Sequence, residues 1–172
     1  MRNNSLYFGA PVADSQGIAL ATRGTSEVGS NVQVVSNLIY FGAGHNHHHC
    51  FDTTGVTLAN FTAFNNNLCF HAAKNGRYSV LHASLTNAKA ASFDTVGLDV
   101  DPRLVAAPAL SNNWSMALKP DSPAMNAGHA SLSSAGDRAL LARPLPADIG
   151  AREYSLSGDR LAPAAPGGMW VD

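Results

Sequence analysis

The chain has 172 residues, of which 13% are charged, and its formal net charge at pH 7 is −1. This length fits one domain with its own hydrophobic core. The nearly neutral charge argues against nucleic acid or an anionic membrane as the main partner, because both require a basic surface, and no apolar run approaches the roughly 18 residues of a membrane span.

The N-terminal stretch MRNNSLYFGAPV carries one positive charge and lacks the apolar segment of a secretory signal. Its YFGA, Tyr7 to Ala10, returns as Tyr40 to Ala43, thirty-three residues later. The segment from Pro11 to about Gly17 is expected to form a loop. Because YFGA occurs twice, the segment that contains Tyr7 is expected to have a counterpart that contains Tyr40.

The middle of the chain favours short strands over helices. Pieces rich in β-branched and aromatic residues, such as VQVV and SNLIYF, recur between Gly and Asn, whereas long runs of Glu, Lys and Leu are missing. This composition predicts an all-β fold.

A period of 21 residues is the main repeat that the sequence suggests. FDTTG at residues 51–55 returns as FDTVG at 93–97, and Gly76 lies halfway between Gly55 and Gly97. Asn66 and Asn87 each lie ten residues before the following glycine of this series. Asn tolerates left-handed backbone at one turn and Gly supplies positive φ at another. The pattern predicts a parallel β-solenoid of few coils, in which each coil lies about 4.8 Å from the previous one.

The histidine-rich stretch from Gly42 to His49 is interpreted as an insertion into this repeat. Asn37 lies eighteen residues before Gly55, where the other coils have ten, and the excess equals the length of the stretch. It is expected on the same side as the loop after Pro11, and loops on one side of a repeat protein often build its binding face.

Three interpretations of the histidines in this stretch remain open. An exposed polar loop is favoured first, a ligand-contacting loop second and a metal site last, because one loop rarely fixes its metal ligands by itself. We expect no metal site. The predicted ligand-binding residues, with an aromatic ring that could stack on a sugar, are His45, His47, His49 and Tyr40, and His48 belongs to the same stretch.

Cys50 and Cys69 are too few to form a disulfide scaffold. They could pair with each other. Two small, buried, unpaired side chains are the preferred interpretation.

A small group of ionisable residues offers the best candidates for catalysis. Elimination from a uronate polysaccharide requires a cation on the sugar carboxylate and a base for the adjacent proton. In the 21-residue register, Asp52 and Asp94 share a column with Lys74 beside it, and two carboxylates two coils apart are separated by roughly 9.6 Å. A charge-compensated surface ladder is preferred over a catalytic pair. The candidates are His71, Lys74, Arg77, Asp52 and Asp94.

The C-terminal third carries three segments in a fixed order: Asp101-Pro102, then Pro120 to Gly128, then Asp148 to Glu153. Together they resemble the C-terminal end of right-handed parallel β-helix repeat proteins, the pectate-lyase-like superfamily. Asp148 and Glu153 are expected to hold the last strand of that motif. The resemblance covers about residues 1–155.

The resemblance implies a right-handed parallel β-helix in an extracellular or cell-surface setting, with a polysaccharide or other glycan as partner and no cofactor. A polysaccharide lyase or glycoside hydrolase is the catalytic version, and a non-catalytic, adhesin-like surface solenoid is the alternative. The chain begins inside a coil, so a C-terminal fragment of a longer protein is expected, with possible self-association through the uncapped N-terminal coil.

The expected organisation has three parts. Residues 1–100 form the coils, residues 101–155 close the same domain, and residues 156–172 form a Pro-, Ala- and Gly-rich flexible tail.

Overall fold

The computed structural model describes residues 1–9, 16–20, 30–43, 49–73, 76–105, 116–138 and 142–154. These residues form short strands and very little helix. In chain order the elements are β1 (Ser5–Phe8), β2 (Gln16–Ala19), β3 (Val32–Val35), β4 (Leu38–Phe41), β5 (His49–Asp52), the 3-10 helix η1 (Leu58–Asn60), β6 (Phe61–Asn65), β7 (Leu68–His71), β8 (Arg77–Ser79) and α1 (Leu85–Ala90).

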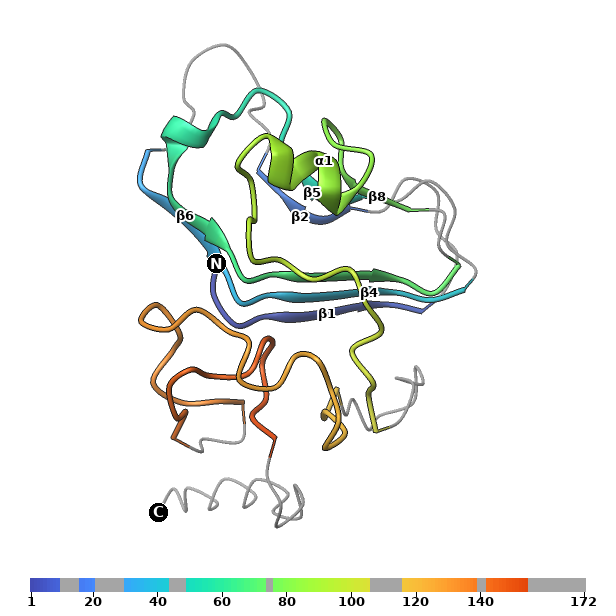
Figure 1. The fold of residues 1–172 in the computed structure, drawn as a ribbon, viewed down its shortest axis with the longest axis vertical. Coiled ribbons are helices and arrows are strands. Elements are labelled where there is room, and N and C mark those ends of the chain that lie inside the picture. Colours follow the sequence, from blue (N-terminus) through green and yellow to red (C-terminus); the bar gives the residue numbers. More distant parts are fainter. Residues whose placement is uncertain are drawn as a thin grey trace, which may run out of the picture.

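The strands form three sheets, and their strand pairings within the described residues are parallel. Sheet I contains β3 and β6, sheet II has the order β1-β4-β7, and sheet III has the order β2-β5-β8. The chain visits the sheets in the same order on each pass, so β3, β4 and β5 are followed by β6, β7 and β8. Figure 1 shows β1 and β4 side by side as a result. The predicted all-β class with parallel strands is confirmed, and the path is compatible with a solenoid.

Sheet II is buried on both faces, which explains its nearly continuous apolar strands. Along β4, Ile39 and Phe41 point into a core cluster shared by the three sheets. Leu38 and Tyr40 point the other way, toward a second cluster formed with the C-terminal segment. Successive side chains of a strand alternate between faces, so LIYF serves two cores at once.

The predicted 21-residue period is wrong. Ladder partners Asn4 and Asn37 are 33 residues apart, and Asn37 and Asn67 are 30 apart. The YFGA echo marks the true register, because Tyr7 pairs with Tyr40. The FDTTG and FDTVG echo misleads, since the first begins in β5 of sheet III and the second follows α1.

The histidine-rich stretch is also placed differently from the prediction. It is no insertion into one coil, because every pass connects sheet II to sheet III at this point, through residues 9–15, 42–48 and 72–76. His49 itself begins β5 and pairs in register with Gln16 and Arg77. Residues 44–48, which include His45, His47 and His48, lie outside the described part of the chain.

Left-handed backbone recurs at the turn between sheets I and II. Asn3, Ser36 and Asn66 have φ values of 51°, 57° and 57°, so the predicted role of Asn66 at a turn is confirmed. Asn87 instead lies inside α1. Of the three predicted turn glycines, Gly55 has positive φ (74°).

Next to this turn, a ladder of amide side chains runs through the stack. Nδ2 of Asn4 donates to Oδ1 of Asn37 at 2.9 Å, and Nδ2 of Asn37 donates to Oδ1 of Asn67 at 2.9 Å. Nδ2 of Asn67 donates in turn to Asp94 at 3.0 Å. Asn37 and Asn67 are fully buried, and the ladder supplies the partners that buried amides require.

The C-terminal segment packs on the outer face of sheet II, below the strands in the view of Figure 1. Leu38 and Leu68 of the sheet contact an apolar set from this segment that includes Leu104, Met116 and Ile149. The segment is also attached through the backbone, because the amide of Gly150 donates to the carbonyl of Ser36 at 2.8 Å.

Helix α1 follows β8 and covers part of the end of the stack. Ser84 caps its N-terminus by accepting a hydrogen bond from the amide of Asn87. Leu85, Ala88 and Phe93 join the shared core. The chain then returns beside the last strands, where Leu98 pairs with Leu68. In the described part of the chain, no helix has the length and apolar character needed to cross a membrane.

Candidate functional site

One column of stacked rings in the core consists of two phenylalanines and ends in a histidine. Phe8 stacks on Phe41 with ring centroids 4.6 Å apart, and Phe41 stacks on the His71 imidazole at 4.8 Å. An aromatic column thus ends in an ionisable ring. His71 is held at the end of β7, where its ring is fixed by Phe41 beneath it.

A carboxylate directly follows the last residue that pairs with β7. Ile39 pairs with Cys69 in sheet II, and the amide of Cys69 donates to the carbonyl of Leu98 at 2.9 Å. Asp99 follows Leu98 directly and is exposed. Partial burial raises the pKa of the Asp99 carboxyl group, so the protonated form extends to a higher pH than for a free aspartate.

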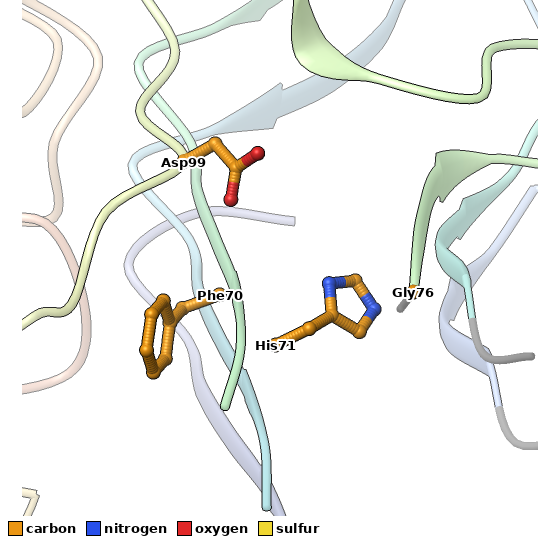
Figure 2. A pocket seen from close by; sticks show the side chains of 4 residues that line it. All are labelled: Phe70, His71, Gly76 and Asp99. Atoms are coloured by element: carbon orange, nitrogen blue, oxygen red, sulfur yellow. The ribbon is translucent and has the colours of Figure 1, made fainter. Parts of the chain in front are cut away.

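These two ionisable groups line one cavity of about 290 Å³, together with Phe70 and Gly76. Figure 2 shows the Asp99 carboxylate and the His71 imidazole reaching into the same space, whereas the Phe70 ring points to the other side of its strand. A Cβ on Gly76 would lie 1.8 Å from the His71 ring. Only glycine therefore fits at the residue before β8, next to this histidine.

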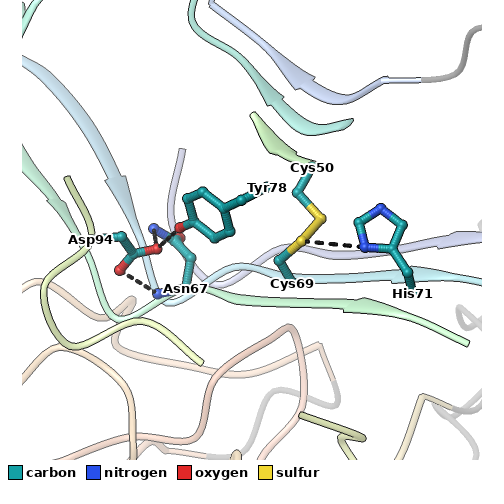
Figure 3. Close-up of a disulfide and its surroundings, with 6 residues drawn as sticks. All are labelled: Cys50, Asn67, Cys69, His71, Tyr78 and Asp94. Atoms are coloured by element: carbon teal, nitrogen blue, oxygen red, sulfur yellow. Dashed lines mark hydrogen bonds between the residues drawn. A yellow bond between two sulfur atoms is a disulfide. The ribbon is translucent and has the colours of Figure 1, made fainter. Parts of the chain in front are cut away.

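A disulfide lies beside the cavity. Cys50 of β5 and Cys69 of β7 are bonded, with their Cα atoms 5.9 Å apart, so the preferred prediction of two unpaired cysteines is wrong. Nδ1 of His71 lies 3.9 Å from Sγ of Cys69 (Figure 3). The bond links sheets III and II across a sequence separation of 19 residues. Closing a loop of this length stabilises the folded state by about 3 kcal/mol.

Asp94 forms a separate buried site at the end of the amide ladder. Its carboxylate accepts hydrogen bonds from Asn67 and from the hydroxyl of Tyr78 (Figure 3). Burial raises the pKa of Asp94 to about 6, although the hydrogen bonds and the charge of Lys89 oppose the rise. Burial and the nearby Asp94 also raise the pKa of Tyr78 well above its ordinary value.

The predicted column of Asp52 and Asp94 does not form. Asp52 lies in β5 of sheet III and pairs in register with Ala19, whereas Asp94 ends the amide ladder beside sheet I. Burial alone would raise the pKa of Asp52, but hydrogen bonds from Thr54 and Gln16, together with the charge of His49, outweigh it and leave the pKa lowered. The predicted charge ladder, and its carboxylate spacing, followed from the wrong 21-residue register.

Of the remaining predicted catalytic residues, His71 and Arg77 are described by the structure and Lys74 is not. His71 lines the cavity, and Arg77 is exposed at the start of β8, next to Gly76. Lys74 lies outside the described residues.

Tyr40 and His49, predicted to bind one ligand, lie on different sheets. Tyr40 is half-buried on the outer face of sheet II, with its ring 5.4 Å from Tyr7 and 5.2 Å from Phe70. Burial, then the charge of Asp101, raises the pKa of its hydroxyl. His49 belongs to sheet III.

Sequence reasoning missed Asp99 as a cavity residue, and it predicted a column of stacked asparagines with the wrong members, Asn66 and Asn87. A signal for the ladder was present, because NSLYF at 4–8, NLIYF at 37–41 and NLCFH at 67–71 align residue by residue. This alignment places His71 in the same column as Phe8 and Phe41. It also identifies Asn4, Asn37 and Asn67 as one column. It also gives the correct spacing between passes.

The cavity brings together groups that can move protons. A carboxyl group with a raised pKa and an imidazole within one small cavity are suited to general acid and base roles. Comparisons of the chain with models of protein families, with curated proteins and with solved structures found no match.

Proposed function

We propose that the chain is an extracellular, right-handed parallel β-helix that binds a polysaccharide, and that the cavity of His71 and Asp99 is its sugar-contacting site. The observation that carries this proposal is the convergence of an imidazole and a carboxylate on one cavity at the end of a stack of parallel strands. A core position that ends an aromatic column needs no ionisable ring for packing, so His71 is better explained by binding or catalysis.

The architecture of the proposal rests on the path of the chain. Successive passes enter sheets I, II and III in the same order and pair in parallel. Parallel strands joined by crossovers are right-handed in nearly all proteins, which favours the right-handed form. The Cys50–Cys69 disulfide supports an oxidising, extracellular setting.

In the catalytic version, we propose elimination from a uronate-containing chain. Arg77, exposed and adjacent in sequence to the cavity-lining Gly76, neutralises the sugar carboxylate and so acidifies the adjacent C–H. Neutral His71 takes that proton, a carbon–carbon double bond forms and the glycosidic C–O bond breaks. Protonated Asp99 gives its proton to the departing oxygen. The raised pKa of Asp99 suits this role as acid.

The test combines two cavity variants with a matched control. Asp99→Asn removes the acid, and His71→Phe removes the base while continuing the column of Phe8 and Phe41. Asp101→Asn changes a second exposed aspartate two residues away, outside the cavity.

Release of unsaturated uronates and of reducing ends is measured on a panel of acidic and neutral polysaccharides. We expect both cavity variants to lose about 10²-fold or more of the activity and the control to keep it. Full activity in both cavity variants would show that the cavity of His71 and Asp99 is not the catalytic site.

A non-catalytic surface solenoid is the second candidate, and one observation favours it. In the described chain, β1 and β2 occupy outer positions of sheets II and III, with a neighbouring strand on one side. Such edges can pair with a second copy. This candidate predicts no turnover on any glycan and an assembly state that rises with protein concentration in sedimentation velocity. Turnover by a monomer would exclude it.

A further inference from the structure

Three side chains beside the cavity carry metal-ligand atoms in one place. Sγ of Cys50, Sγ of Cys69 and a ring nitrogen of His71 all lie within 4.8 Å of one another, and the three residues are buried. Figure 3 shows the His71 ring facing the sulfur pair. This is the one such group of three or more among the described residues.

The spacing fits a tetrahedral metal centre. Zinc–sulfur bonds of about 2.3 Å and zinc–nitrogen bonds of about 2.0–2.1 Å place a sulfur and a nitrogen ligand roughly 3.6 Å apart. Sγ of Cys69 and Nδ1 of His71 are 3.9 Å apart. The two sulfurs are bonded and so too close together to share a metal. Breaking their bond lets them separate while the Cα atoms, 5.9 Å apart, keep them within reach of one ion.

The three residues are positioned by the fold as well as by the disulfide. Cys69 and His71 are two residues apart on β7 and so face the same side, and Cys50 enters from β5 of sheet III. The His71 ring is held by stacking on Phe41 and by the close approach of Gly76. Strand pairing therefore keeps the group assembled when the disulfide is open.

The cavity completes the arrangement. It is lined by His71, so an ion that enters the cavity meets the imidazole of this group. It can also supply water as a fourth ligand. Two cysteines, one histidine and an open position match the ligand chemistry of zinc.

We propose that reduction of the Cys50–Cys69 disulfide converts Cys50, Cys69 and His71 into a binding site for Zn²⁺ or a similar divalent ion. The reductant, a phosphine, donates two electrons to the disulfide and takes an oxygen from water, which leaves phosphine oxide and two thiols. The metal then displaces the two thiol protons and binds the thiolates and the imidazole. This site goes beyond the proposed function, because it requires no glycan.

The experiment uses the full chain and Co²⁺ as a spectroscopic probe. Thiolate ligands give Co²⁺ an intense near-ultraviolet charge-transfer band, and tetrahedral geometry gives strong visible bands. We expect both bands after reduction, at one Co²⁺ per chain, with loss of both when Zn²⁺ is added. The oxidised chain should show no thiolate band.

Variants separate this cluster from the histidine-rich stretch. Cys69→Ser should abolish the thiolate band, and His71→Phe should weaken Co²⁺ binding roughly tenfold or more. His49→Gln, a histidine next to Cys50 but outside the cluster, should change nothing. Equal Co²⁺ spectra in the oxidised and reduced chains, or an unchanged spectrum in His71→Phe, would overturn the proposal.

A folding measurement tests whether reduction of the disulfide partly unfolds the strand stack. Circular dichroism and a thiol count are recorded on the reduced chain with and without Zn²⁺. We expect Zn²⁺ to restore or raise the melting temperature of the reduced chain and not that of Cys50→Ser/Cys69→Ser. A reduced chain with two free thiols that Zn²⁺ neither binds nor stabilises contradicts the site.

Discussion

The strand stack, β1 to β8, and the C-terminal segment, residues 99–154, satisfy their buried polar groups in opposite ways. In the stack, one amide repeats and each copy binds the next, from Asn4 to Asn67. In the C-terminal segment, single charged side chains bind scattered backbone groups, as when Asp148 accepts from the amides of Asn126 and Tyr154. A repeating backbone offers every pass the same partner, whereas an irregular backbone requires a separate partner for each group.

The largest effect is expected from the buried ion pair of the C-terminal segment. Arg143 donates to Glu153, and their side chains are 1% and 6% exposed. Glu153→Ala leaves the guanidinium buried without its counter-charge, so we expect a loss of about 3–5 kcal/mol in the free energy of unfolding. Urea denaturation measures the loss.

The exposed pair of Arg103 and Asp121, at 53% and 63% exposure, is the control for this variant. Asp121→Ala should cost less than about 1 kcal/mol. Equal losses for Glu153→Ala and Asp121→Ala would mean that the C-terminal segment does not depend on its buried charges.

The next effect is a pH dependence at the end of the amide ladder. The folded pKa of Asp94 is about 6, above the ordinary aspartate value of 3.8. The unfolded chain releases this proton at lower pH than the folded chain, so the contribution of Asp94 to stability falls as the pH rises from about 4 to about 6 and is constant above. The fall is on the order of 3 kcal/mol or less.

Asp94→Asn tests this pH dependence with little change in shape. Its amide oxygen can accept from Asn67 as Asn37 accepts from Asn4, and no proton is released. We expect urea midpoints of the variant to lose the fall between pH 4 and pH 6 that the unaltered chain shows. A fall of the same size in Asp94→Asn would assign it to another group.

A smaller effect is expected within the ladder. Asn37→Ala removes the partner of both Asn4 and Asn67 and should cost about 2 kcal/mol in the free energy of unfolding, because buried donors and acceptors lose their bonds. Asn4→Ala, at the first step, should cost less. If thermal melts show the two variants to be equally destabilised, the ladder does not act as a connected series.

The smallest effect on stability is expected at the cavity. His71→Phe replaces the last ring of the column formed by Phe8 and Phe41 with a third phenylalanine. We expect a change within about 1 kcal/mol, because the volume and stacking are conserved. Calorimetry checks this, and a large destabilisation would show that the imidazole has a structural role.

The site was less accessible to sequence reasoning than the strands were. The composition pointed to β structure, and the YFGA echo contained the register of sheet II, where Tyr7 pairs with Tyr40. The competing FDTTG echo, which joins a strand to the residues after α1, led to a shorter period and with it to the wrong neighbours for Asp52 and Asp94. Asp99 carries no local signal, because its role follows from sharing a cavity with His71.

The sequence by itself determined that this chain forms short strands and very little helix, since β-branched and aromatic residues between Asn and Gly turns favour strands. Tertiary structure alone decided which strands are neighbours, which cysteines meet and which ionisable groups share a cavity. The physical reason is register: strands of four apolar residues that are buried on both faces, such as β4, permit several alignments by local pattern, and packing between passes selects one.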